Sequence, residues 1–234
     1  MKNGGKKFFE FGTTIVTWTA TDIIGNQSTI LQDVQVVDTT LPTIFTPSNV
    51  QVEATSMEST IVDYGFAQAS DQIEVSSITN DAPEVFPLGE TIVTWTATDK
   101  FGNTSLSTQT ISLKVCGNSP SYYNMIVGTD DDDLLIGTTM ADLIFAKAGD
   151  DIISADKGND CIIAGDGDDI IFGNEGNDHI SGQGGNDILK GNSGEDVIIG
   201  GNGLDVIDGG EDIDTCKIID ERNRDIVIRC ELDE

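Results

Sequence analysis

The sequence predicts an all-β protein, with β-sandwich modules in the first half and a parallel β-roll in the second. A nine-letter, strand-like segment occurs twice in the first half. An aspartate recurs at every ninth position through ten blocks between residues 128 and 217. Near residue 117 the composition changes from alternating runs rich in Thr, Val and Ile to runs rich in Gly and Asp, which predicts a domain boundary and a linker at residues 117–127.

The charge of the chain limits its partners. The 234 residues hold 12 Lys and Arg against 41 Asp and Glu, a net charge of −29. Such a surface repels nucleic acid and anionic membranes and attracts cations. No stretch approaches the roughly 18 apolar residues of a membrane span. The basic start, residues 1–7, lacks the apolar run of a signal peptide, so we expect another export signal or an N-terminally incomplete sequence.

The repeated segment in the first half predicts a strand that ends in a turn. Residues 14–22 and 91–99 share the sequence TIVTWTATD, and both copies continue to a Gly-Asn pair. Because side chains alternate faces along a strand, Val93, Trp95 and Ala97 share one face, which we expect to be the core. The same expectation applies to the earlier copy.

The spacing between the copies, from Thr14 to Thr91, is the length of a whole small sandwich. We therefore expect a complete module at residues 40–116 and only the C-terminal part of another at residues 1–39. The stretch from Gly89 to Asp99, with Gly102 and Asn103, resembles the hyalin repeat (HYR) family of Ig-like sandwiches, which occur in extracellular and adhesive proteins. This resemblance implies adhesion or spacing and no catalysis.

The second half divides into ten blocks of nine, from Gly128 to Lys217. The sixth position is always aspartate: Asp133, Asp142, Asp151, Asp160, Asp169, Asp178, Asp187, Asp196, Asp205 and Asp214. The fourth position is glycine in seven blocks: Gly149, Gly158, Gly167, Gly176, Gly185, Gly194 and Gly203. The eighth position is Ile or Leu in nine blocks and Cys216 in the last. We expect each block to form a six-residue turn, where glycine tolerates positive φ, and a three-residue strand whose eighth residue points inward.

Two blocks make one coil, so ten blocks predict five coils stacked about 4.8 Å apart. Aspartates two blocks apart then stack on the same side, where neighbouring carboxylates repel by roughly 3 kcal/mol at an effective dielectric constant near 20. Residues 128–217 hold four Lys against 22 Asp and Glu, a net charge of −18. About eight divalent ions, one in each gap between turns, would cancel most of it, and calcium suits these oxygen ligands better than magnesium or zinc.

The block pattern Gly-Gly-x-Gly-x-Asp-x-aliphatic-x, met fully by residues 200–208, resembles the repeats-in-toxin (RTX) family. The resemblance implies calcium held by sixth-position carboxylates of two turns on one side. It also implies that carbonyl groups of alternate residues among the first four positions, the fourth-position glycines included, complete the shell, and that calcium outside the cell triggers folding. The fourth position departs from glycine at Asp131, Met140 and Asp212, so the pattern carries over best to the five central gaps, from Asp151 to Asp205.

The tail, residues 218–234, is expected to form a capping hairpin. Residues 225–230 read as a strand, and a turn at residues 221–224 would bring Cys230 opposite Cys216. A disulfide there would suit an oxidising compartment; the alternative is two unpaired thiols.

Three further residues carry no predicted chemistry. Cys116 has no evident partner, and Cys161, at an outward seventh position, is interpreted as a small apolar filler. His179, the only histidine, is interpreted as structural or solvated.

Together these features predict a secreted or cell-surface calcium-binding protein without catalytic activity. Its expected partners are calcium ions and cell-surface or matrix proteins or glycans. The sequence has no nucleophile–base pair, zinc motif or phosphate loop. The alternative is a non-catalytic C-terminal fragment of a larger secreted enzyme or toxin.

Overall fold

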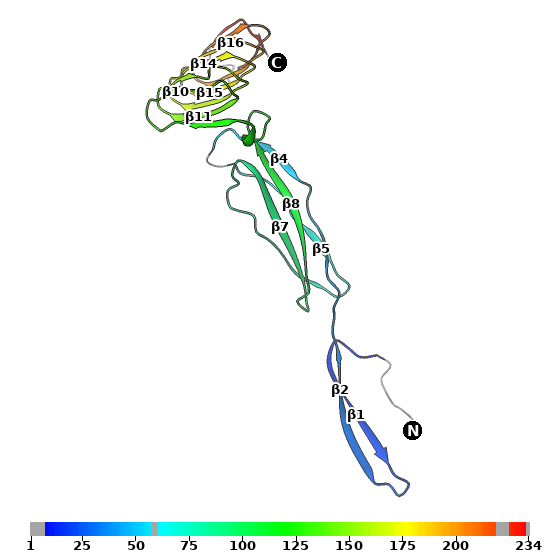
Figure 1. The fold of residues 1–234 in the computed structure, drawn as a ribbon. Helices are drawn as coiled ribbons and strands as arrows, with labels where there is room; N and C mark the ends of the chain where they lie inside the picture. Colours follow the sequence, from blue (N-terminus) through cyan, green and yellow to red (C-terminus); the bar gives the residue numbers. More distant parts are fainter. Residues whose placement is uncertain (1–7, 58–59, 219–224, 233–234) are drawn as a thin grey trace. The chain divides into compact units, whose positions relative to one another are not determined.

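A computed structural model describes residues 8–57, 60–218 and 225–232, which form strands and turns almost throughout (Figure 1). The all-β prediction is confirmed, since the described part has a single short 3₁₀ helix, η1 (Pro120–Tyr122). The chain forms two compact units: residues 1–48, 65–82 and 93–109 make the first, and residues 49–64, 83–92 and 110–234 make the second. The basic start, residues 1–7, lies outside the described residues. No helix among the described residues is long and apolar enough to cross a membrane.

The first copy of the repeated strand forms an antiparallel hairpin. β1 (Gly12–Thr21) pairs with β2 (Gln27–Val36). Asp22 builds the turn, because its Oδ1 accepts hydrogen bonds from the backbone N–H groups of Ile24 and Asn26, both at 2.9 Å. The expected core face is not buried in this copy, where Trp18 is 44% exposed.

The second copy repeats the same local structure in a buried setting. It lies in β7 (Gly89–Asp99), and the carboxylate of Asp99 accepts the two equivalent backbone bonds in its turn. Trp95 is 3% exposed and its Nε1 donates to Gln109 Oε1 at 3.1 Å, as Trp18 Nε1 donates to Gln32 Oε1 at 2.8 Å. The predicted core role of this face is therefore confirmed for the second copy.

Sandwich-like sheets occupy the region predicted as a complete module. β3 (Thr43–Phe45) pairs antiparallel with β5 (Gln68–Ser70). A second sheet has the order β4-β8-β7-β6, with β4 (Val50–Glu53), β8 (Thr104–Lys114) and β6 (Val75–Asn80).

The C-terminal part of the second unit is a parallel β-solenoid of about six turns (Figure 1). Every pairing between its neighbouring strands is parallel. One sheet contains β10 (Leu134–Ile136), β12 (Ile152–Ser154), β14 (Ile170–Glu175), β16 (Ile188–Ser193), β18 (Val206–Glu211) and β20 (Ile226–Ile228). The other contains β9 (Asn124–Val127), β11 (Asp142–Ala148), β13 (Cys161–Asp166), β15 (His179–Gly184), β17 (Val197–Asn202), β19 (Thr215–Lys217) and β21 (Glu231–Leu232).

The pairing follows the predicted coil of two blocks. Ile152 pairs with Ile170, and Ile170 with Ile188, so each strand stacks on the strand two blocks later in the sequence. The eighth-position side chains form one buried core, as predicted: Ile144, Ile153, Ile162, Ile171, Ile180, Leu189, Ile198, Ile207 and Cys216 are all 0% exposed. Each such side chain contributes roughly 1.5–3 kcal/mol by burial, but only because the next coil covers it.

The roll is longer at both ends than the sequence predicts. Residues 124–127, expected in the linker, form β9 and pair in parallel with β11, so the linker interpretation is wrong for them. The capping hairpin is also wrong, because β20 pairs in parallel with β18 and β21 in parallel with β19. The predicted turn at residues 221–224 lies outside the described residues. Both corrections have one cause: by extending the stack, each end strand packs its inward residue, Ile126 or Val227, against the core.

Candidate metal centre

The sixth-position aspartates form two buried ladders, one on each side of the roll. The first ladder comprises Asp133, Asp151, Asp169, Asp187 and Asp205, and the second comprises Asp142, Asp160, Asp178, Asp196 and Asp214. All except Asp133 are at most 2% exposed. Carboxylates are almost never buried to this extent without a compensating charge or ion.

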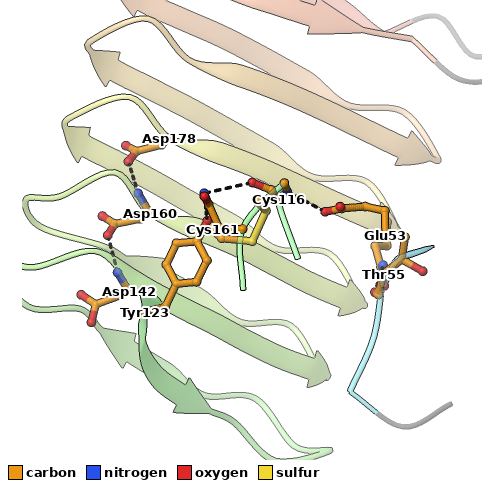
Figure 2. The surroundings of a disulfide bond; sticks show 11 residues. Glu53, Thr55, Cys116, Tyr123, Asp142, Asp160, Cys161 and Asp178 are labelled. Carbon is orange, nitrogen blue, oxygen red and sulfur yellow. Dashed lines mark hydrogen bonds between the residues drawn. A yellow bond between two sulfur atoms is a disulfide. The ribbon is translucent and has the colours of Figure 1, made fainter. Parts of the chain in front are cut away.

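Within each ladder, one carboxylate oxygen fixes the stacking of the coils. From Asp151 to Asp214, the Oδ1 atom of each ladder aspartate accepts a hydrogen bond from the backbone N–H of the ladder aspartate one coil earlier. In the first ladder Asp151 N donates to Asp169 Oδ1 at 2.9 Å. In the second, Asp160 N donates to Asp178 Oδ1 at 2.9 Å, and the bonds among Asp142, Asp160 and Asp178 are visible in Figure 2.

The second carboxylate oxygen is the chemically informative one. In eight of the predicted aspartates Oδ2 is buried and has no hydrogen-bond partner among the described residues: Asp151, Asp160, Asp169, Asp178, Asp187, Asp196, Asp205 and Asp214. A buried charged oxygen without a partner costs several kcal/mol. The ladders therefore present rows of oxygens that need a positive partner.

The first coil differs from the others. Asp133 Oδ2 accepts a bond from Thr129 N at 2.6 Å, and Asp142 Oδ2 accepts one from Thr138 N at 2.5 Å. These two oxygens are therefore satisfied by the protein, in the same two blocks where Asp131 and Met140 replace the fourth-position glycine.

The fourth-position glycines bring backbone carbonyl oxygens to the ladders. From Gly167 to Gly203, an added Cβ would lie closer than 3.0 Å to the carbonyl oxygen of the fourth-position glycine one coil earlier. All seven glycines have positive φ, as predicted: Gly149, Gly158, Gly167, Gly176, Gly185, Gly194 and Gly203. A side chain is therefore excluded both by space and by backbone conformation.

First-position glycines make a second close approach. In the blocks that begin at Gly173, Gly182, Gly191 and Gly200, an added Cβ would lie closer than 3.0 Å to Oδ2 of the block's own aspartate. For three of them it would also meet the first-position carbonyl oxygen of the next coil. Carboxylate and carbonyl oxygens thus converge around the oxygens that lack partners.

Burial changes the acidity of the ladders. Loss of solvation raises the pKa of Asp160 and Asp169 to about 6, and that of Asp178, Asp187 and Asp196 to about 7. The hydrogen bond from the preceding coil opposes the rise, and neighbouring carboxylates add to it. Without a metal ion, ionising the ladder carboxylates therefore costs free energy, and a bound dication would remove that cost.

The residues present fit calcium. The converging donors are carboxylate and carbonyl oxygens, the ligands of a hard cation with flexible geometry. Zinc would require Cys or His. His179 lies outside both ladders, and burial lowers its pKa, which favours the neutral structural role predicted for it.

Both pairs of cysteines form disulfides in the structure. Cys216 bonds to Cys230, with 5.6 Å between their Cα atoms. Cys116 bonds to Cys161, with 6.0 Å between Cα atoms, so Cys161 is not the simple apolar filler that its position suggested. Figure 2 shows this second bond beside Tyr123 and the second ladder. Partners 45 residues apart, in segments of different composition, leave no sequence signal for this pairing.

The ladder contains one residue that the nonapeptide count missed. Asp225 Oδ1 accepts a hydrogen bond from Asp205 N at 3.1 Å, in the place where the first ladder would continue. Its sequence separation from Asp205 is 20, where successive ladder aspartates are separated by 18, so a strict count of nines passes over it. The signal available was local: Asp225, Ile226 and Val227 repeat the Asp-x-aliphatic order of positions six to eight.

These features define a protein with a calcium-binding parallel β-roll that follows sandwich-like sheets. The sequence matches the RTX calcium-binding nonapeptide repeat over residues 127–162, 158–189 and 181–216, and the HYR domain over residues 37–113. The chain thus carries RTX calcium-binding repeats and an HYR domain.

Known relatives are similar to about half of the chain. Hyalin from Strongylocentrotus purpuratus is 34% identical over 120 residues, and hyalin from Lytechinus variegatus is 35% identical over 121. Each match covers 48% of this chain but only 10% and 23% of the respective hyalin. A Sushi, von Willebrand factor type A, EGF and pentraxin domain-containing protein 1 from Rattus norvegicus is 33% identical over 98 residues, 41% of this chain and 3% of its own length.

Proposed function

We propose that the chain is an extracellular binding or adhesion protein whose roll folds when calcium enters the gaps between successive turns. The observation that carries this proposal is the row of buried Oδ2 atoms without partners in both ladders. The ten aspartates leave four gaps on each side, room for about eight ions. Each ion would be held by carboxylates of two successive turns and by carbonyl groups of the glycine-rich positions.

The residues give calcium a structural role. Oδ1 sets the spacing of the coils through its bond to the preceding backbone N–H, and Oδ2 is left for the ion. Without the ion, stacked carboxylates repel one another by roughly 3 kcal/mol per pair at an effective dielectric constant near 20. The chain would therefore stay open at low calcium and close at the higher concentrations found outside cells.

The location and the adhesive role rest on separate support. Two disulfides suit an oxidising compartment. The HYR domain and the likeness to hyalin favour a surface or matrix protein, with cell-surface or matrix proteins or glycans as partners. We also propose that the chain has no catalytic activity of its own and acts by binding.

Circular dichroism of the full chain in calcium and in chelator tests the folding proposal. We expect the strand signal of the roll to be lost in chelator and restored by calcium. Asp187→Asn, which removes the charge of a buried ladder residue, should raise the calcium concentration at half-folding severalfold. Asp168→Asn is the matched control, because Asp168 is the exposed neighbour of a ladder residue and Asn can still accept the bond from Asn186 N. A strand signal that chelator leaves unchanged would refute the proposal.

Adhesion needs its own assay. Beads coated with the full chain should aggregate, or bind matrix-coated surfaces, in calcium and release in chelator. If the wild-type roll is folded in calcium but the beads neither aggregate nor bind, the adhesive role is refuted and the calcium proposal is unaffected.

A further inference from the structure

The tail continues the roll by one coil that the nonapeptide pattern does not contain. β20 pairs with β18 in parallel, with Ile226 beside Val206. Ile226 N donates to Asp205 O at 2.8 Å, just as Val206 N donates to Asp187 O at 2.8 Å. Ile226 follows its partner Val206 by 20 residues, two more than the 18 between Ile188 and Val206, and it lies beyond residue 216, where the match to the RTX repeat ends.

Asp225, itself half-buried, repeats the arrangement of both carboxylate oxygens of the ladder aspartates. Its Oδ1 accepts the bond from Asp205 N at 3.1 Å. Its Oδ2 is buried and has no partner among the described residues. Asp205, one coil earlier, is 1% exposed, and its Oδ2 is also without a described partner. The gap between these two aspartates therefore has the same unsatisfied oxygens as the gaps inside the repeats.

One disulfide and one ion pair hold this last coil to the rest of the roll. Cys230 is bonded to Cys216, whose side chain is fully buried at the end of the core. Arg229 donates from Nε to Asp208 Oδ1 at 2.7 Å and pairs with the other carboxylate oxygen as well. This guanidinium pairs with Asp208, and no ion pair joins it to Asp225 in the part of the chain that the structure describes.

We propose that Asp205 and Asp225 form an additional calcium site, which closes the C-terminal end of the roll and depends on the Cys216–Cys230 disulfide. The proposal rests on the proposed function, because it assigns to this gap the ion that the repeats hold. It adds a ligand outside the repeats and makes that ligand conditional on oxidation. A chain with Cys216 and Cys230 reduced would keep its repeat sites and lose this one.

Native mass spectrometry of the full chain in saturating calcium counts bound ions directly. We expect Asp225→Asn to bind one ion fewer than the wild type, because Asn keeps an oxygen for the Asp205 N–H bond but loses the charge. Glu211→Gln is the matched control, since it removes one exposed carboxylate near the same end and should leave the count unchanged. The double variant Cys216→Ala with Cys230→Ala should also lose one ion.

Amide hydrogen exchange gives a second readout that does not depend on the count. Calcium should protect the β20 segment at least tenfold in the wild type, and this gain should vanish in Asp225→Asn while the β18 segment stays protected. An unchanged ion count and unchanged β20 protection in Asp225→Asn would overturn the site. A full count in the cysteine variant would overturn its dependence on the disulfide. A wild type that binds no calcium would instead refute the proposed function itself.

Discussion

Gly176→Ala is expected to disrupt the stack of coils. Gly176 has φ +131°, and a Cβ there would overlap the carbonyl oxygen of Gly158 in the preceding coil. A left-handed conformation costs a non-glycine residue about 1–2 kcal/mol, and forcing volume into a packed site costs about 1–3 kcal/mol more. We therefore expect a loss of about 4 kcal/mol from the free energy of unfolding of the calcium-loaded roll.

The same loss of unfolding free energy can be expressed as a change in the calcium concentration at which half of the chains are folded. If about eight ions bind only to the folded roll, a loss of about 4 kcal/mol divides into about 0.5 kcal/mol per ion, so the calcium concentration at half-folding rises about twofold. Calcium titration followed by circular dichroism, together with thermal unfolding at fixed calcium, measures both quantities.

A nearby glycine provides the control. Gly184 lacks the left-handed φ, and the nearest atom to an added Cβ is Asp166 Oδ1, at 3.1 Å, the end of an exposed side chain that can move. Gly184→Ala should therefore change the midpoint little. Equal effects of Gly176→Ala and Gly184→Ala would refute the argument that the carbonyl approach at the fourth position requires glycine.

Two further predictions concern the uncharged ladder and the repeated tryptophan. In chelator, lowering the pH should stabilise the roll: the folded-state pKa of Asp178 is about 7, above its usual value of 3.8, so the folded chain binds protons more tightly. This stabilisation should be complete near pH 4 and lost as the pH rises through about 6 to 7, and a strand signal that falls on acidification would contradict it. Trp95→Ala should lower the free energy of unfolding by about 3–5 kcal/mol, because Trp95 is 3% exposed. Trp18→Ala should lower it far less, because Trp18 is 44% exposed. Thermal unfolding of both variants tests this contrast, and equal losses would contradict it.

The fold of the roll could be predicted because its determinants are local and repeated. Ile162, Ile180 and Ile198 need only their position in the block to be placed in the core. The positive φ of the fourth-position glycines could likewise be predicted from their position in the block. The positive φ at the second position, as at Asn174 and Gln183, was not predicted. A signal was present at that position, since the block pattern itself has glycine there, as at Gly201, and asparagine is among the residues that adopt positive φ most readily.

What the sequence could not predict depends on contacts between distant or irregular segments. The Cys116–Cys161 bond joins residues 45 apart with no shared motif. β9 was missed, and the strand at β20 was predicted but assigned to a hairpin, because each segment occurs once, outside the period of nine. The exposed setting of Trp18 could not be distinguished from the buried setting of Trp95, since the two repeated segments are identical and only their neighbours differ.

The geometry of one side chain explains why the sixth position is aspartate in all ten blocks. Oδ1 must reach the backbone N–H one coil earlier, at 2.9 Å for Asp151 and Asp169, which fixes the length of the side chain and disfavours glutamate. Oδ2 must keep its negative charge, because carbonyl oxygens of the glycine-rich positions lie near it and only a cation can satisfy both kinds of oxygen at once. Asparagine would keep the first interaction and place an N–H₂ donor at the second, without the charge that attracts a dication. The two oxygens thus perform different tasks, one holding the coils together and the other holding the ion, and only aspartate supplies both at this spacing.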